Sequence, residues 1–286
     1  MIKDETIQKV YEQVVEPNEP VLKTGFYDLD EILKGIEKSS LITIGARPAM
    51  GKTAFMTNLM LNLLKQKKKC LYFSLEMCET QLVKRLIGQI GEIDSMLMSS
   101  PGQIATQKKE IEKFTEALNK ITKYDLTIFD GAMNIKDIKE KIEDEKADFV
   151  FIDYLQLIQS SGKKSRNEAI DDIMRELKNI AKENNCMIFL TSQLSRALES
   201  RCDKRPMLSD LRESGSIENL SDVVIFIYRE DYYNSGYDES NEDYVQNKGK
   251  ADIIVAKNKY GPVCYINLLF RSSIMKFLEP VRHDWF

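Results

Sequence analysis

Histidine, paired cysteines and long apolar runs are scarce in this chain, and each scarcity excludes a class of function. The only histidine among 286 residues is His283, which excludes most general-base and metal-site schemes built on imidazole. The five cysteines are an odd number without a C-x-x-C pair, so we expect reduced thiols and neither a disulfide framework nor a zinc site. They are Cys70, Cys78, Cys186, Cys202 and Cys264.

Apolar stretches are too short to suggest a membrane protein. None approaches the roughly eighteen residues that a membrane span needs, and the N-terminal sequence MIKDETIQKV contains no apolar signal core. We therefore expect a cytoplasmic protein without membrane contact. The formal net charge of −4 gives no overall attraction to nucleic acid, so any contact with DNA or RNA must be local.

Apolar runs alternate with segments of helical spacing along most of the chain. Strands are expected at 41–44, 70–75, 126–129, 149–152, 187–191, 223–228, 253–256 and 263–270. Helices are expected at 4–16, 54–64, 80–90, 104–121, 135–142 and 168–183. This alternation predicts an α/β fold with a mostly parallel central sheet, helices on both faces and an antiparallel C-terminal hairpin.

Residues 45–53, GARPAMGKT, lie between an expected strand and an expected helix. Such a loop directs backbone N–H groups and the positive end of the helix dipole at one spot, which suits a phosphate chain. Lys52 would place its ammonium on the outer phosphates, and the Thr53 hydroxyl would ligate Mg²⁺. The sequence departs from G-x-x-x-x-G-K-[ST] at Ala46, which replaces the first glycine and is tolerable if its φ stays negative.

Three further polar residues, Glu76, Asp153 and Gln193, follow expected strands. Because ligands sit at the carboxyl ends of parallel strands, we expect these side chains beside the phosphate loop. Asp153 suits a carboxylate that holds Mg²⁺ through water, Glu76 a general base for the attacking water, and Gln193 a γ-phosphate sensor. Each also has a structural explanation: a common strand-end carboxylate, a helix-start carboxylate favoured by the dipole, and a strand-end cap.

Five ordered motifs resemble the RecA-like ATPase domain of DnaB-type replicative helicases, a P-loop NTPase fold. They are GARPAMGKT, FSLEM at 73–77, DYLQLI at 153–158, TSQLSR at 191–196 and KRPMLSDLRESGSIENLSDVVIFIYRE at 204–230. The similarity runs from about Thr24 to the C-terminus, and this family commonly has alanine at the place of Ala46. The resemblance implies a homohexameric ring that hydrolyses ATP with Mg²⁺ between subunits and moves 5′ to 3′ on single-stranded DNA to separate strands.

The resemblance also implies roles in the nucleotide site. Lys52 would bind phosphate, Thr53 and a water held by Asp153 would bind Mg²⁺, Glu76 would be the catalytic base, and Gln193 would link the γ-phosphate to DNA. The other nucleotide-binding positions that it implies are Ala49, Met50, Gly51, Ala54 and, on the helix after FSLEM, Arg85.

Two segments are expected to face the DNA channel. Arg212, Glu213 and Gly215 in LRESG match a loop that grips the backbone of single-stranded DNA through charge and main-chain N–H groups, contacts that carry no sequence information. The basic residues in or near the two segments are Lys163, Lys164, Arg166, Arg201, Lys204 and Arg205. Individually such residues are more often solvated surface, and we expect about half of them to contact DNA.

The hairpin at 253–262, IIVAKNKYGP, matches a family element in which a Lys-x-Arg pair projects into the neighbouring subunit's ATP site. Here the pair is Lys257 and Lys259. Lysine supplies charge but not the planar fork of arginine, so we expect slower hydrolysis or a smaller part for Lys259. If these fingers act in trans, a monomer is not the competent species.

DnaB-type helicases usually carry an N-terminal helical domain that contacts primase, and this chain begins about where their linker helix begins. We therefore divide it into a linker helix and connector at 1–22 and an ATPase domain at 23–286. In the family the linker docks on the adjacent subunit. The chain fits either a domain of a longer helicase, with primase and a loader as partners of the missing part, or a naturally short relative.

Three alternatives remain open at this point. A RecA- or RadA-type recombinase shares the fold and ATP site but assembles filaments, and LRESGSIENLSD favours the helicase over it. A nucleotide-dependent scaffold would bind ATP to assemble without moving on DNA, and would lack DNA-stimulated turnover. A fragment too poorly oligomeric to unwind DNA would bind ATP without motor activity.

Overall fold

The computed structural model describes most of the chain between residues 22 and 280. The described ranges are 22–34, 36–160, 165–211, 215–233 and 248–280, together with Asp4, Ile7, Gln8 and Tyr11. The helix expected at 4–16 therefore lies mostly outside the described residues. Also outside them are Lys163, Lys164, Arg212, Glu213 and His283.

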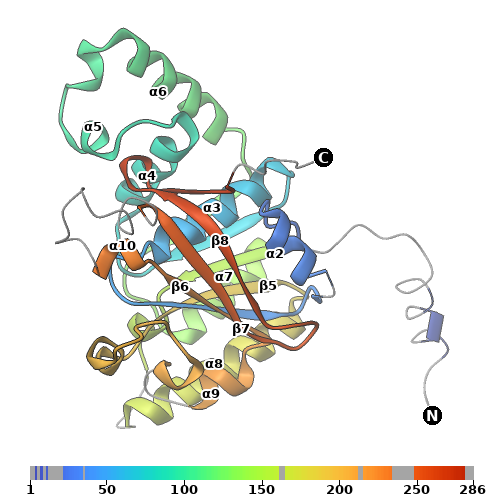
Figure 1. Ribbon diagram of the computed structural model, residues 1–286. Coiled ribbons are helices and arrows are strands. Elements are labelled where there is room, and N and C mark those ends of the chain that lie inside the picture. Colours follow the sequence, from blue (N-terminus) through green and yellow to red (C-terminus); the bar gives the residue numbers. More distant parts are fainter. Residues whose placement is uncertain are drawn as a thin grey trace.

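A single sheet of nine strands, counted over the described ranges, forms the centre of the fold (Figure 1). Its order is β3-β2-β4-β5-β1-β6-β7-β8-β9. The first six strands in this order are β3 (Leu126–Asp130), β2 (Cys70–Ser74), β4 (Phe149–Asp153), β5 (Met187–Gln193), β1 (Leu41–Ala46) and β6 (Val223–Tyr228), all parallel. The antiparallel strands are β7 (Lys250–Asn258), β8 (Cys264–Arg271) and β9 (Lys276–Leu278). The expected fold class and C-terminal hairpin are confirmed.

Helices cover both faces of this sheet. The helices of the described ranges are α2 (Tyr27–Ile32), α3 (Lys52–Lys65), α4 (Glu79–Gly91), α5 (Ser95–Ser99), α6 (Lys108–Ile121), α7 (Ile135–Glu145), α8 (Arg166–Glu183), α9 (Gly215–Leu220) and α10 (Glu230–Tyr233), of which α5 and α6 pack on α4. In Figure 1, α5 and α6 lie at the opposite end of the molecule from α8 and α9. None of the helices within the described ranges is both long and apolar enough to cross a membrane.

The central parallel strands are largely apolar because both of their faces are buried, whereas the edge strand β3 is only partly buried and ends in Asp130. In β4, Phe149 and Phe151 point to the core cluster under α3, whereas Val150 and Ile152 point to the cluster under α7 and α8. The Phe151 ring stacks between Tyr72 of β2 and Phe189 of β5, with centroids 6.1 and 4.9 Å away. This alternation fixes the register, since a slip of one residue would exchange the two faces.

The helix expected at 104–121 is wrong in its first turn. Residues Ile104–Thr106 form a separate 3₁₀ turn, and α6 begins only at Lys108. The cause is Gln107, whose extended backbone (φ −119°, ψ 100°) interrupts the helical path. Ile104 therefore has the spacing of the helix but does not belong to its apolar face.

Each of the five cysteines is a free thiol in the structure. Burial raises the pKa of the Cys186 thiol to about 12, which keeps it protonated and unreactive near neutral pH. Cys78 and Cys202 are exposed.

Candidate functional site

The phosphate loop joins β1 to α3 near the middle of the sheet. Ala46 is the last residue of β1 and has extended strand backbone, so the condition for tolerating alanine there is met. Gly51 precedes α3 with a left-handed φ of 96°, and a Cβ at this position would lie 3.0 Å from the Phe277 ring. No side chain caps α3, so its first N–H groups remain available to an anion.

A cavity of about 430 Å³ opens over this loop, and we call it the phosphate-loop cavity. Such a volume is typical of ligand sites. It brings together these predicted residues: Ala49, Gly51, Lys52, Thr53, Ala54, Glu76, Arg85 and Gln193. Two other predicted members do not line it, because Met50 is buried in the core and Asp153 lies behind Thr53. The ends of β1, β2 and β5 thus meet at one cavity, as the strand-end rule predicts.

Asp153 is buried and accepts hydrogen bonds from three hydroxyl groups. Its Oδ2 accepts from Thr53 Oγ1 at 2.7 Å and from Tyr72 Oη at 3.2 Å, and its Oδ1 accepts from Thr191 Oγ1 at 2.5 Å. Because the Thr53 hydroxyl donates to Asp153, its oxygen lone pairs are left for the cavity. A hydroxyl oxygen with a carboxylate behind it is a donor set that suits Mg²⁺.

Lys52 is a half-buried cation of the cavity. Burial lowers the pKa of its ammonium, and the nearby carboxylates of Asp153 and Glu76 oppose that shift. The Lys52 Nζ lies 4.8 Å from the centre of the Tyr154 ring. A partly desolvated ammonium beside free helix N–H groups fits the phosphates of a nucleotide.

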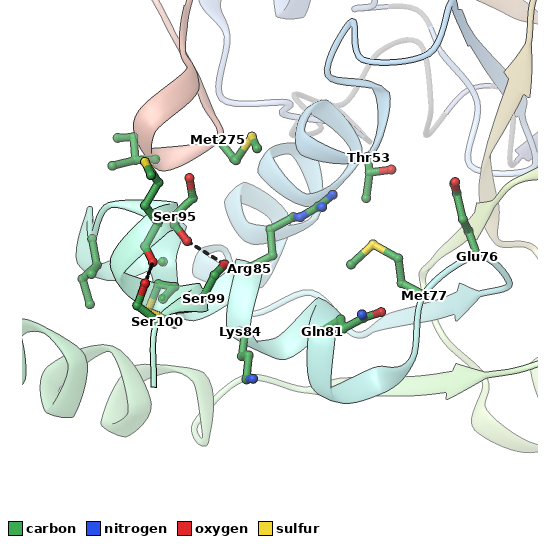
Figure 2. Close-up of a pocket in the computed structure, with 15 residues that line it drawn as sticks. Thr53, Glu76, Met77, Gln81, Lys84, Arg85, Ser95, Ser99, Ser100 and Met275 are labelled. Atoms are coloured by element: carbon green, nitrogen blue, oxygen red, sulfur yellow. Dashed lines mark hydrogen bonds between the residues drawn. The ribbon is translucent and has the colours of Figure 1, made fainter. Parts of the chain in front are cut away.

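A second, larger cavity of about 820 Å³ adjoins the first and shares Thr53, Glu76, Arg85 and Met275 with it. Figure 2 shows Arg85 extending from α4 toward Thr53, while Glu76 stands at the end of β2. The Arg85 position expected to reach the phosphates therefore faces the phosphate loop. The remaining walls of this larger cavity come from α4, α5 and the turn before β9.

Sequence reasoning missed several residues that line the phosphate-loop cavity, among them Arg47, Tyr154 and Arg229. The Arg229 guanidinium lies 4.4 Å from the Phe270 ring centre and pairs with Asp231 at 3.1 Å. Arg229 directly follows β6, so the strand-end rule applied to that strand would have found it. Arg47 lies within the loop motif, but only the structure reveals its partners.

The predicted fingers Lys257 and Lys259 do not line the phosphate-loop cavity of their own chain. The register pairs Asn258 of β7 with Val223, and Val223 with Ile42 at the start of β1. The phosphate loop follows the other end of β1, about 13 Å away at 3.3 Å per strand residue. The Lys257 ammonium instead donates to the backbone oxygens of Glu218 at 2.6 Å and Asn219 at 3.1 Å, at the end of α9.

The described members of the predicted DNA surface have intramolecular partners. Arg201 donates to both carboxylate oxygens of Asp210, at 3.3 and 2.8 Å, and Arg205 pairs with Asp252 at 3.1 Å. The other positions are Arg166, which donates to the backbone oxygen of Gln156, Lys204, which lies 4.7 Å from the Tyr233 ring centre, and Gly215, which begins α9. These contacts leave the DNA-binding role of each residue a prediction.

Comparisons with known proteins agree on one family. The model of the DnaB-like helicase C-terminal domain matches residues 21–279. A probable replicative DNA helicase of Trieres chinensis is 40% identical over 272 residues, which are 92% of this chain and 58% of that protein. The replicative DNA helicase DnaB of Geobacillus stearothermophilus is 38% identical over 266 residues, which are 90% of this chain and 56% of that protein. The chain thus spans less than two thirds of the length of these curated relatives.

Solved structures show the same relationship. One solved ATPase domain matches with a TM-score of 0.88 and 34% identity, over 97% of this chain and 98% of that chain. A DnaB-like replicative helicase matches with a TM-score of 0.85 and 34% identity, over 97% of this chain and 67% of that chain. Together with the sheet and the phosphate loop, these matches confirm the predicted RecA-like fold. The chain therefore belongs to the family of DnaB-like helicase C-terminal domains.

Proposed function

We propose that this chain is the ATP-hydrolysing motor domain of a replicative DNA helicase. The observation that carries the proposal is the phosphate-loop cavity, where Lys52, Thr53 and Glu76 converge from separate elements around a loop with free helix N–H groups. Membership of the family supports the same activity. The activity of the complete protein, its substrates and its partners are part of this proposal.

The cavity residues divide the work of phosphoryl transfer. The loop N–H groups and the Lys52 ammonium would bind the outer phosphates of ATP, and Arg85 would reach them from α4. Mg²⁺ bound by the Thr53 hydroxyl and by water that Asp153 holds would offset the charge of the phosphates. Glu76 would orient and deprotonate the attacking water, while Gln193 would contact the γ-phosphate from the end of β5.

The DNA-contacting surface would consist of the segments around 161–166 and 201–215. Gly215 and the neighbouring residues Arg212 and Glu213 would hold the sugar-phosphate backbone of single-stranded DNA. Contacts of this kind bind any sequence, which suits a motor that travels along a template. The net charge of −4 supports such local contacts rather than a generally basic surface.

A homohexameric ring would complete the ATP site. Lys257 and Lys259 lie beside the start of β1, at the opposite end of that strand from their own phosphate loop, which supports a role at the site of a neighbouring subunit. Two lysines in place of a lysine and an arginine would supply charge without a bidentate fork. One solved structure that this chain matches is that of a DnaB-like replicative helicase, and that helicase interacts with primase. We extend that partner, and a helicase loader, to the complete protein.

Steady-state ATP hydrolysis across a protein concentration series, with and without single-stranded DNA, tests the proposal. We expect specific activity to rise with concentration, because the fingers act in trans, and to rise further with DNA. Turnover that is independent of concentration and indifferent to DNA would refute the ring motor and favour a nucleotide-dependent scaffold. Filaments in place of rings under electron microscopy would favour a RecA- or RadA-type recombinase.

A further inference from the structure

Arg47 is a buried cation in the phosphate loop whose hydrogen bonds all lead to one other segment. Only 7% of the surface of Arg47 is exposed to solvent. Its Nε and Nη2 donate to Glu199 Oε1 at 2.9 and 2.7 Å, and its Nη1 donates to the backbone oxygen of Leu194 at 2.9 Å. Glu199 and Leu194 both belong to residues 194–211, which follow β5 and which we call the post-β5 segment.

The post-β5 segment is closed on itself, so its two ends lie side by side. Leu194 and Leu211 form an antiparallel bridge, and the Ser195 N–H donates to the backbone oxygen of Asp210 at 2.9 Å. The bidentate contact of Arg201 with Asp210 ties the middle of the segment to its end. Its beginning and its end are therefore held to each other by hydrogen bonds.

Leu211 is the first residue of LRESG, and the four residues after it, 212–215, form the proposed DNA-contacting loop. A short path of contacts thus leads from the phosphate loop through Arg47 and Glu199 to the post-β5 segment, and the next residue in the chain belongs to the proposed DNA-contacting loop. Arg47 is suited to this because a guanidinium makes several hydrogen bonds in a fixed plane, whereas a lysine would act as a single point charge.

Packing alone explains this contact poorly. A guanidinium removed from water needs good geometry and further hydrogen bonds to repay its desolvation, so a buried ion pair is a weak source of stability. Here the carboxylate partner is half-exposed, with 48% of its side chain accessible, while the Arg47 side chain is 8% accessible. An apolar residue in place of Arg47 would fill the same space without this cost, but it would not hold the post-β5 segment to the phosphate loop.

We propose that Arg47 is a positioning residue that couples the nucleotide cavity to the DNA loop through Glu199 and the post-β5 segment. The inference rests on the proposed function. Nucleotide binding orders the phosphate loop, and the Arg47 contacts carry that order to the post-β5 segment. Because coupling between two sites is reciprocal, DNA must raise nucleotide affinity by the same factor by which nucleotide raises DNA affinity, commonly about 5–150-fold.

Glu199→Gln in the full chain is the test, because it removes the charge and keeps the shape of a residue outside both cavities. The affinity for oligo-thymidylate is measured with and without a non-hydrolysable ATP analogue, and the affinity for the analogue with and without oligo-thymidylate. We expect each affinity alone to change less than about threefold, and the mutual enhancement to fall from about 5–150-fold to nearly onefold, equally in both directions. Glu199→Asp, which keeps the charge on a shorter stem, should lose less.

Glu92→Gln is the matched control, because Glu92 is 50% accessible and pairs with Lys276 at 2.6 Å away from the post-β5 segment. It should keep the full mutual enhancement. If Glu199→Gln also keeps it, or if Glu199→Asp and Glu199→Gln lose it equally, the coupling role of Arg47 is overturned while the motor function stands. If the unsubstituted protein shows no mutual enhancement, the proposed function fails and the inference falls with it.

Discussion

Replacing Glu76 with glutamine exchanges a carboxylate at the end of β2 for an amide of the same size. Glu76 is an exposed residue that lines the phosphate-loop cavity, and its charge is one of the two that oppose the lowered pKa of Lys52. General-base catalysis commonly contributes about 10²–10⁴-fold to a rate, which corresponds to roughly 3–5 kcal/mol of activation free energy. We expect kcat for ATP hydrolysis to fall by about that factor.

Binding should respond in the opposite direction to hydrolysis. Because glutamine removes a negative charge beside the triphosphate, ATP affinity should stay equal or increase, whereas loss of a Mg²⁺ ligand would weaken it. Steady-state turnover, nucleotide affinity and sedimentation of the assembled ring measure the three quantities separately. Glu79→Gln is the control, because Glu79 is exposed on the first turn of α4 and lines neither cavity. Turnover of Glu76→Gln within tenfold of the unsubstituted protein would refute the general-base assignment.

Three further predictions concern charge, packing and DNA. Burial lowers the pKa of Lys52 below 10.5 in the free protein, and bound phosphate would raise it. At a pH between the pKa of the free protein and that of the complex, ATP binding should therefore take up a proton, and ATP affinity should fall as pH rises. Calorimetry in two alkaline buffers of different ionisation enthalpy detects this proton uptake, and its absence contradicts the lowered pKa. Gly45→Ala should destabilise the fold by about 1–3 kcal/mol and lower the melting temperature by several degrees, because its Cβ would lie 2.7 Å from the Phe226 ring. Gly88→Ala should raise the melting temperature, because its Cβ would lie 3.5 Å from the nearest side-chain atom and alanine favours the helix α4. Arg212→Ala should weaken single-stranded DNA binding equally for all sequences, with a shallower salt dependence; a sequence-selective loss would argue against a backbone grip.

The parallel core was predictable because its chemistry is local and repetitive. Apolar runs such as residues 149–152 are long enough to be recognised, and the polar residue that ends each run marks the edge where ligands bind. That single rule led to Glu76, Asp153 and Gln193, and two of the three line the phosphate-loop cavity. Asp153 instead supports Thr53 from behind.

Shorter and less regular features were not predictable in the same way. The strand β9 has three residues and α5 has five, so neither shows a full period of its pattern. Ile104 had the correct helical spacing, but one extended residue at Gln107 separates it from α6. The burial of Arg47 depends on Glu199, which is 152 positions away in a segment without periodicity.

The three hydroxyl groups around Asp153 have an evolutionary consequence. Thr53, Tyr72 and Thr191 come from α3, β2 and β5, and together they donate to both oxygens of one carboxylate. A change at Asp153 removes the shared acceptor of all three hydroxyl groups, and a donor that is lost cannot be replaced from within, because a carboxylate accepts hydrogen bonds and cannot donate them. Among related chains we therefore expect these four positions, remote from one another in the sequence, to be inherited as a unit and to change together when they change at all.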